Sequence, residues 1–274
     1  MTELVVRRLS IDLESPFAMR WAGGDAFRSA FFNALSMSFP IGEQYFIDSV
    51  RAGLRLLPAA RQGDFAAEIR GFVGQEATHR RLHGVFNDQL ERLGLRNVVE
   101  VRARRRIERD AHLDVRIHVA ATAATEHFTA VFADWLFAHP EVLAGSEPRL
   151  ATLWLWHAAE ESEHRATAFD LYRALSGSEH WRIRVYRYVT LVFLADILRQ
   201  TLRNLWQDRA LWHWRTWRSG WRLLLGRDGL LRANLGRWRQ YLDAGFHPNR
   251  TASAAGAAWL REHASVLRII GQDG

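Results

Sequence analysis

Seven glutamate and histidine side chains recur along this chain at spacings that an α-helix brings onto one face. They form two lone glutamates, one Glu-x-x-His pair and one longer element, which in chain order are Glu43; Glu76 and His79; Glu126; and His157, Glu161 and His164. Residues three, four or seven positions apart lie on the same side of a helix. Four helices that turn such faces inward enclose a two-metal carboxylate site. The pattern therefore predicts an all-α, four-helix bundle around a dinuclear metal centre.

Each of these side chains interrupts a stripe of residues that is otherwise apolar. Along the second predicted helix the inward face reads Phe65, Ile69, Phe72, Glu76, His79, His83, Phe86, Leu90 and Leu93. A carboxylate buried without compensation costs several kcal/mol. Two divalent ions would balance the charge of the four glutamates. The Glu-x-x-His pattern alone carries little weight, because 16 Glu and 12 His in 274 positions give ~0.7 such pairs by chance. The order of the motifs and their place on apolar stripes carry the prediction.

Apolar periodicity predicts four long helices, over residues 25–57, 64–93, 107–138 and 148–175. The first is a single helix or a helix pair. Pro40 lacks the N–H that would bond the Ser36 carbonyl, so it begins a second segment or kinks the helix. Beyond residue 181, three or four further helices are expected, with breaks near residues 226–229 and 246–248.

The length of 274 residues suits one large domain, or a bundle of about 180 residues with an appendage. We predict a metal-binding bundle over residues 1–180. The remaining residues, 181–274, form a helical extension rich in tryptophan and arginine that packs on the bundle.

The composition limits the metal chemistry. Cysteine is absent, which excludes disulfides, thiolate catalysis and thiolate-bound zinc or iron–sulfur sites. Any metal is then held by Glu, Asp, His and water, a ligand set that suits iron, manganese or zinc. We expect two iron ions, with manganese or zinc as alternatives.

A net charge of +7 comes wholly from arginine, and its excess lies at residues 102–106 and beyond residue 181. Such a surface attracts anionic lipid, nucleic acid or an acidic substrate. No nucleic-acid-binding signature accompanies it, so nucleic acid is not an expected partner. The first residues lack the apolar core of a secretory signal, and no apolar run is long enough to span a bilayer. A cytoplasmic protein is expected.

Two segments of the extension, 186–194 and 212–221, mix aromatic residues with arginine as interfacial amphipathic helices do. Peripheral membrane contact is one hypothesis for them. The alternative, which we favour, is that these helices pack over the bundle or form the interface of a homodimer.

Several side chains near the motifs are harder to assign. His157 is a seventh ligand, which we favour, or a group that orients the carboxylates. His83 extends the second face by one turn and suits a supporting or core role. Glu160 and Glu163 point off the motif face and are expected to be solvated or salt-bridged. No spacing argument assigns a role to three further histidines, His112, His118 and His127.

The pattern resembles the ferritin-like non-haem di-iron proteins. The element from His157 to His164 is similar to that of the di-iron N-oxygenases that convert aryl amines to nitro compounds. Local strings resemble more closely a bacterial family of predicted metal-dependent hydrolases, over about residues 25–185. These strings are Gly42-Glu43-Gln44-Tyr45-Phe46, Gly74-Gln75-Glu76-Ala77-Thr78-His79, Thr125-Glu126-His127-Phe128-Thr129, Trp156-His157-Ala158-Ala159-Glu160-Glu161-Ser162-Glu163-His164 and Ala168-Phe169-Asp170. The resemblance implies the same seven ligands, with the four glutamates as the catalytic carboxylates.

Three functions follow as hypotheses. The leading one is an O₂-dependent di-iron oxygenase or oxidase that acts on an apolar or lipid-like small molecule, with an electron donor that the sequence does not identify. The second is a two-metal hydrolase of an ester, amide or phosphoester. The third is a metal-binding protein without catalysis. We expect Phe46, Thr122 and Thr129 in the wall of the substrate pocket.

Overall fold

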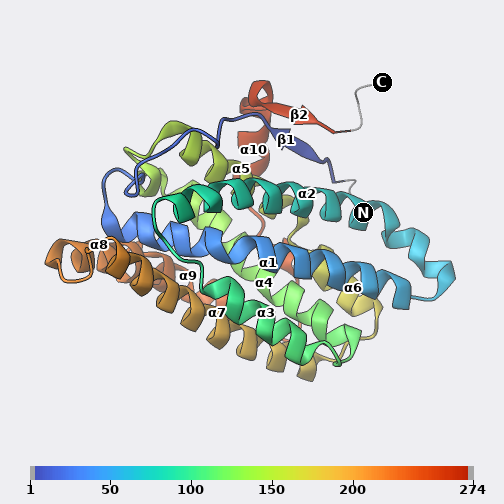
Figure 1. The fold of residues 1–274 in the computed structure, drawn as a ribbon. Coiled ribbons are helices and arrows are strands. Elements are labelled where there is room, and N and C mark those ends of the chain that lie inside the picture. Colours follow the sequence, from blue (N-terminus) through green and yellow to red (C-terminus); the bar gives the residue numbers. More distant parts are fainter. Residues whose placement is uncertain (1–3, 271–274) are drawn as a thin grey trace.

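The computed structural model describes residues 4–270, which form a helical molecule with two short strands (Figure 1). The α-helices are α1 (Ala26–Leu56), α2 (Ala59–Arg92), α3 (Val99–Asp110), α4 (Val115–Ala138), α5 (Pro148–His164), α6 (Thr167–Ala174), α7 (Glu179–Gln207), α8 (Trp214–Leu225), α9 (Leu230–Gln240) and α10 (Ala255–Glu262). Short 3₁₀ turns cover Pro140–Leu143, Pro248–Thr251 and Ala264–Val266, and the strands are β1 (Arg7–Leu9) and β2 (Leu267–Ile269). The all-α prediction is confirmed.

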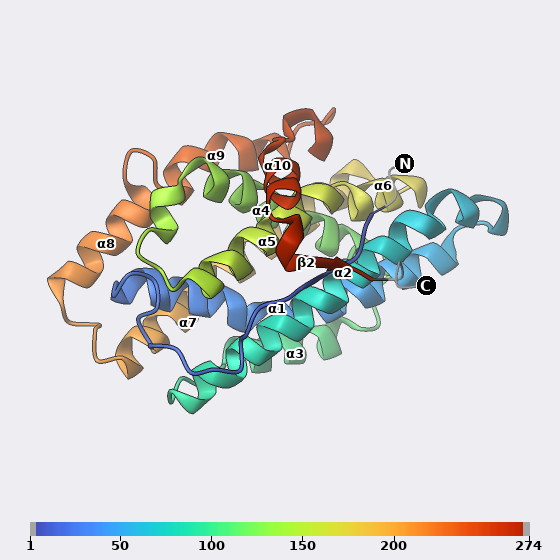
Figure 2. The same cartoon turned by 90° about the horizontal axis from the view of Figure 1, so that it is seen from above.

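The bundle is formed by α1, α2, α4 and the α5–α6 segment. Figures 1 and 2 show α1 and α2 side by side, with α4 beneath them and α5 and α6 alongside. Helix α1 contacts both α2 and α4, and α4 contacts both α5 and α6. The faces between these helices hold the buried apolar core, which includes Phe32, Phe72, Phe86 and Leu150.

Helix α1 runs unbroken through Pro40, which decides between one helix and two. The Asp25 carboxylate caps its start by accepting a hydrogen bond from the Arg28 N–H. The Ser36 carbonyl, which Pro40 cannot bond, accepts a hydrogen bond of 2.9 Å from the Asn87 side-chain amide on α2. A contact between helices thus replaces the bond that the helix lost.

Two predicted helices are wrong in extent. The predicted helix 107–138 is two elements, because α3 ends at Asp110 and α4 begins after Asp114, whose side chain accepts a hydrogen bond from the Arg116 N–H. The predicted helix 148–175 is interrupted at residues 165–166. There the buried guanidinium of Arg165 forms two hydrogen bonds of 3.1 and 3.2 Å with Asp134 on α4.

The C-terminal helices α7 to α10 agree with the predicted three or four, with the break at residues 226–229 between α8 and α9. Helix α7 packs on α1 and α4, α9 packs on α4, and α10 packs on α5. Gly220 lets α8 approach α1, since a Cβ there would lie 2.5 Å from the Phe27 ring. The division of the chain near residue 180 stays a prediction, and residues 1–3 and 271–274 lie outside the described part.

The two short strands were not predicted from the sequence. They pair antiparallel, with Arg8 opposite Arg268, and so join the two ends of the described chain. The segment before β1 crosses α2 closely. A Cβ at Gly74 would lie 2.3 Å from the Val6 side chain, so this approach requires glycine. Within residues 4–270, no helix combines the length and the apolar character needed to cross a bilayer.

Candidate metal centre

The structure brings the seven predicted ligands together in the middle of the bundle. Glu43 comes from α1, Glu76 and His79 from α2, Glu126 from α4, and the remaining three from α5. All seven side chains are buried. Each of the four helices turns its polar residues inward on a face that is otherwise apolar, as the spacing predicts. That these residues bind metal stays a prediction, which the geometry below supports.

The ligand atoms form three overlapping groups, and within each group all of them lie within 4.8 Å of one another. These groups are Glu43, His79 and His157; Glu76, His79 and Glu161; and Glu76, Glu126 and His164. The Nε2 atom of His164 lies 3.2 Å from a Glu76 oxygen and 3.3 Å from a Glu126 oxygen. Because Glu76 and His79 each occur in two groups, the arrangement is one continuous cluster, wide enough for two ions.

Many of the cluster's polar atoms have no hydrogen-bond partner in the protein. Among the described residues, both carboxylate oxygens of Glu43, Glu76 and Glu126 are buried in this way, as are one oxygen of Glu161, Nδ1 of His79 and Nε2 of His164. Buried polar atoms are nearly always paired. Unpaired oxygens and imidazole nitrogens that converge on one point are the donor set of a cation site. These residues therefore fit a pair of divalent metal ions.

A residue outside the cluster holds the outer nitrogen of His79. The His79 Nε2 atom lies 3.0 Å from Glu160, whose other oxygen lies 3.3 Å from Arg7 of β1. Burial raises the pKa of Glu160, and Arg7 acts in the opposite direction. In its ionised form, which Arg7 favours, Glu160 accepts a hydrogen bond from Nε2–H. The lone pair of Nδ1 then faces the cluster, as a metal ligand requires.

The outer nitrogen of His164 is held by Gln75. Its Nδ1 atom lies 2.9 Å from the side-chain oxygen of Gln75. The Gln75 amide nitrogen donates to Glu163 and to the Val5 carbonyl, which fixes the orientation of the amide. His164 must therefore donate from Nδ1, and the lone pair of Nε2 faces Glu76 and Glu126.

A chain of hydrogen bonds fixes His157 in the same way. Ser36 donates its hydroxyl hydrogen to Asn87, so its oxygen accepts from Nδ1 of His83, 2.8 Å away. The Nε2 atom of His83 is then an acceptor for Nδ1–H of His157, at 2.7 Å. The remaining nitrogen of His157, Nε2, faces Glu161 at 3.0 Å and Glu43 at 3.9 Å. This supports the ligand role for His157 and gives His83 the predicted supporting role.

Burial and mutual repulsion among the carboxylates favour bound cations in the cluster. Burial raises the pKa of Glu43, Glu76 and Glu126, and the charge of Glu161 raises each of them further. Burial also acts to raise the pKa of Glu161, but His164 and His157 hold it well below its usual range. Burial lowers the pKa of His79. Divalent cations among the carboxylates would act against the effect of burial.

Other predictions near the centre have mixed outcomes. Glu163 is salt-bridged to Arg7 at 2.7 Å, as expected. Glu160 is salt-bridged too, but it is fully buried rather than solvated, and it contacts His79. Sequence reasoning missed Gln75 and Arg7. Gln75 directly precedes Glu76, so its position beside the motif was a signal that could have been used. No spacing relates Arg7 to the motifs, because only the fold brings it to Glu160 and Glu163.

The three unassigned histidines lie away from the cluster contacts. His112 is exposed at the end of α3. His118 contacts the Tyr45 hydroxyl at 2.9 Å, and His127 contacts the Arg237 carbonyl at 3.2 Å.

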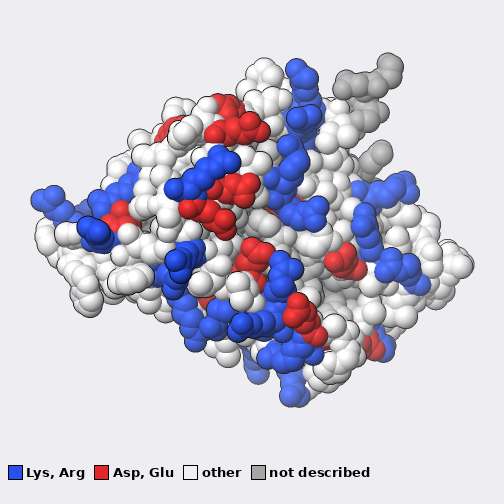
Figure 3. Space-filling view, in the orientation of Figure 1, with Lys and Arg blue, Asp and Glu red and all other residues white. Residues whose placement is uncertain are grey.

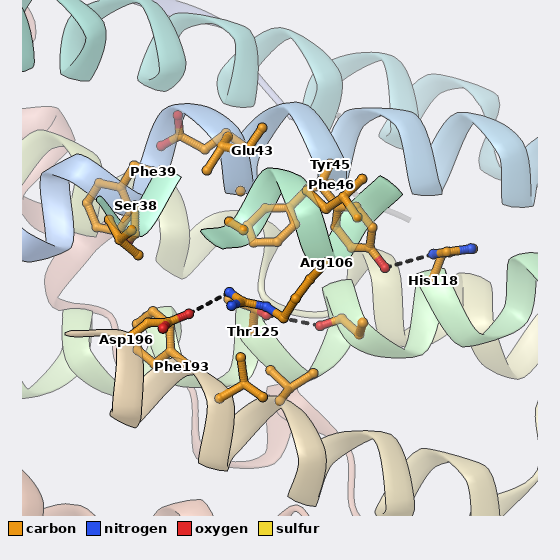
Figure 4. Close-up of a pocket in the computed structure, with 18 of the residues that line it drawn as sticks. Ser38, Phe39, Glu43, Tyr45, Phe46, Arg106, His118, Thr125, Phe193 and Asp196 are labelled. Carbon is orange, nitrogen blue, oxygen red and sulfur yellow. Dashed lines mark hydrogen bonds and ion pairs between the residues drawn. The ribbon is translucent and has the colours of Figure 1, made fainter. Parts of the chain in front are cut away.

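A cavity of about 200 Å³ lies beside the centre, between α1, α3, α4 and α7. Figure 4 shows Glu43 and Phe46 on α1, with Asp196 of α7 on the opposite side. Phe46 and Thr129 line this cavity, as expected. Thr122 does not, because it is fully buried in the bundle, where its hydroxyl lies 2.6 Å from that of Ser49. Glu43 belongs to both the cavity wall and the ligand cluster.

The family of the chain follows from its sequence as a whole. Residues 5–252 match the model of a family described as predicted metal-dependent hydrolases. The chain belongs to this family. Comparisons with curated proteins and with solved structures gave no match. The match extends beyond α7 into the C-terminal helices, and the family description agrees with the buried Glu and His cluster as a candidate metal site.

Proposed function

We propose that this protein is a dinuclear-metal-dependent hydrolase of an ester, amide or phosphoester with a largely apolar substrate. One observation carries the proposal: a buried cluster of four carboxylates and three imidazoles, with unpaired atoms turned inward, adjoins an apolar cavity at Glu43. The family description supports hydrolysis. It favours this reaction over the oxidation that the ligand set alone suggested.

The seven side chains would bind the two ions in two groups. Glu76, Glu126 and His164 would hold one ion, Glu43, His79 and His157 the other, with Glu161 between them. Bound divalent ions supply Lewis acidity and lower the pKa of water. Gln75, Glu160 and His83 each hold an imidazole ring so that its inner nitrogen faces the ions.

Glu43 reaches both the ions and the substrate. Its side chain lines the cavity, and its carboxylate is turned toward the ligand cluster, where neither oxygen has a hydrogen-bond donor in the described protein (Figure 4). It is therefore placed to accept a proton from an attacking water molecule. Phe39 and Phe46 form an apolar wall at this end of the cavity.

The test combines elemental analysis with an anaerobic hydrolysis assay. Purified protein should carry about two divalent ions per chain, and zinc- or manganese-loaded protein should hydrolyse acyl esters without O₂. Chelation should abolish turnover and lower the Tm. Glu76→Gln should lose metal and activity together, whereas Glu91→Gln, an exposed position on the same helix, should retain both. Protein that binds the ions but turns over no ester, amide or phosphoester would contradict hydrolysis and leave oxidation or metal binding without catalysis.

Oxidation by a di-iron centre is the second candidate. Four carboxylates, three imidazoles and an apolar cavity also suit O₂ chemistry on an apolar molecule. Two ferrous ions would supply one electron each, and the substrate or an external electron donor would supply the rest that the reduction of O₂ requires. The iron-loaded, reduced protein should then consume O₂ in proportion to its iron. Zinc-loaded protein that hydrolyses esters, with no O₂ uptake by the iron form, would remove this candidate.

A further inference from the structure

A second, more apolar cavity adjoins the one beside Glu43. That second cavity, of about 240 Å³, lies between α1, α4, α7 and α9. Phe39, Thr129 and Phe193 line both cavities, so the two meet at these side chains. Together they fall in the size range of small-molecule sites, roughly 300–1,000 Å³. Their walls are mostly apolar, which suits an alkyl chain.

The outer end of the first cavity is basic. A surface groove on α3 and α7 shares Arg106, Tyr188, Val192 and Asp196 with the cavity. Figure 3 shows blue side chains gathered over the area where α3 lies in Figure 1. The groove and cavity therefore form one path from a charged surface to the ligand Glu43.

Arginine exceeds acid in this groove. Asp196 is buried and is contacted by Arg102 at 2.7 Å, by Arg106 at 2.5 Å and by Arg199 at 3.6 Å. Three guanidinium groups thus share one carboxylate, which leaves two positive charges. Arg102 and Arg199 are largely exposed. Each guanidinium has five N–H donors, so both retain donors for an anion.

Resting on the proposed function, we propose that the substrate is a single-chain amphiphile with an anionic head group. The head binds Arg102 and Arg199 in the groove, with Arg106 held in place by Asp196. The alkyl chain enters beside Tyr188 and fills the apolar path. A carboxylate and a phosphate head share the chemistry that the arginines recognise. With the charged head at the surface, the ester, amide or phosphoester bond that is hydrolysed near Glu43 would lie within the chain, away from the head.

Isothermal titration of the metal-loaded, full-length protein tests this inference. The probes are dodecanoate, dodecyl phosphate, dodecanol and butyrate, each below the concentration at which it forms micelles. Dodecanoate or dodecyl phosphate should bind much more tightly than butyrate, since each buried methylene contributes about fourfold in affinity. The comparison of the two anions identifies the preferred head.

Matched variants separate the head from the chain. Arg102→Gln combined with Arg199→Gln should weaken dodecanoate binding by about tenfold or more and leave dodecanol binding unchanged. Arg104→Gln combined with Arg105→Gln removes the same charge from α3 outside the groove and should change neither. Ala103→Trp places a large side chain in the cavity wall and should weaken all long-chain probes. Its metal content and circular dichroism check that the protein is folded.

The outcomes distinguish this inference from the proposed function. Three results would overturn the inference. Dodecanol could bind as tightly as both anions, or butyrate as tightly as dodecanoate. The two arginine pairs could also lose the same amount of affinity for dodecanoate. Binding that is absent from metal-loaded, ester-hydrolysing protein would overturn the inference alone. If the purified protein cannot hold metal and yet binds the long-chain anions, the proposed function fails and the inference about the substrate's shape stands.

Discussion

Each imidazole in the centre is oriented by a different partner on its outer side. Glu160 contacts His79, Gln75 contacts His164, and His83 contacts His157. A histidine has one nitrogen available to a metal only when the other is held as a donor. The three outer partners therefore decide which nitrogen of each ring faces the carboxylates.

His83 offers a test of this principle at a single residue. His83→Leu preserves an apolar core but leaves Nδ1 of His157 without its acceptor. We expect the metal affinity to fall about 10–100-fold, as for other outer partners of metal ligands. Competition with a chromophoric chelator measures the affinity. His112→Leu, at an exposed position, is the control and should bind metal normally. Unchanged affinity in His83→Leu would show that the relay from Ser36 does not position His157.

The sequence identified the seven clustered residues because all lie on four helix faces with a fixed period. Among the partners of the imidazoles, His83 shares that regularity, one turn beyond His79, whereas Gln75 and Glu160 do not. Arg7 reaches Glu160 from a strand at the other end of the chain, and Asn87 reaches Ser36 across two helices. Such contacts depend on how the helices and strands pack, and the spacing of residues along one helix carries no information about that packing.

At the scale of elements, the helix boundaries show which signals are local. Asp114 caps the start of α4 by accepting a hydrogen bond, and an aspartate before an apolar helix is a signal that the sequence contains. The prediction of one helix over 107–138 followed the apolar periodicity instead. The break between α5 and α6 has no such sign. Residues 164–167 contain neither glycine nor proline, and the break coincides with the buried pairing of Arg165 with Asp134. A tertiary ion pair accompanies this break, so no local pattern could predict it.

The approach of the N-terminal segment to α2 yields a prediction for two glycines of one helix. Gly74→Ala places a Cβ 2.3 Å from Val6 and should destabilise the protein by about 1–3 kcal/mol, the usual cost of overpacking. Gly84→Ala meets nothing within 4 Å and should stabilise it by about 0.4–1 kcal/mol. Urea unfolding measures both. Stabilisation by both substitutions would show that the segment before β1 does not rest on α2.

At the scale of the whole molecule, aromatic residues are exposed at one end. Trp206, Trp212, Trp214 and Trp221 of α7, α8 and the loop between them are more than half exposed, and Trp212 reaches 88%. Arg218 lies over the Trp214 ring. The buried side of α8 faces α1 through Gly220, so its tryptophans and arginines point outward. In the segment 186–194, Tyr186 is buried against Tyr241, whereas Tyr188, Leu191 and Leu194 are exposed.

The exposed tryptophans narrow the predicted membrane contact to the α8 end of the molecule. Tryptophan and arginine on one helix face favour the interface of an anionic bilayer. The protein should therefore sediment with phosphatidylglycerol vesicles and less with phosphatidylcholine vesicles, and high salt should weaken the binding. Trp212→Ser combined with Trp214→Ser should reduce sedimentation, whereas Trp181→Ser, at the opposite end of α7, should not.

The alternative occupant of this face is a second copy of the chain, and the same variants decide between them. A homodimer through α8 would elute at twice the monomer mass, and Trp212→Ser combined with Trp214→Ser would return it to a monomer. The wild-type dimer would then bury its tryptophans and leave the vesicles in the supernatant. Failure to sediment with anionic vesicles at low salt, by a protein that is monomeric, would contradict both. Membrane binding would in turn bring a lipid-derived amphiphile to the groove on α3 and α7, since α7 leads directly to α8.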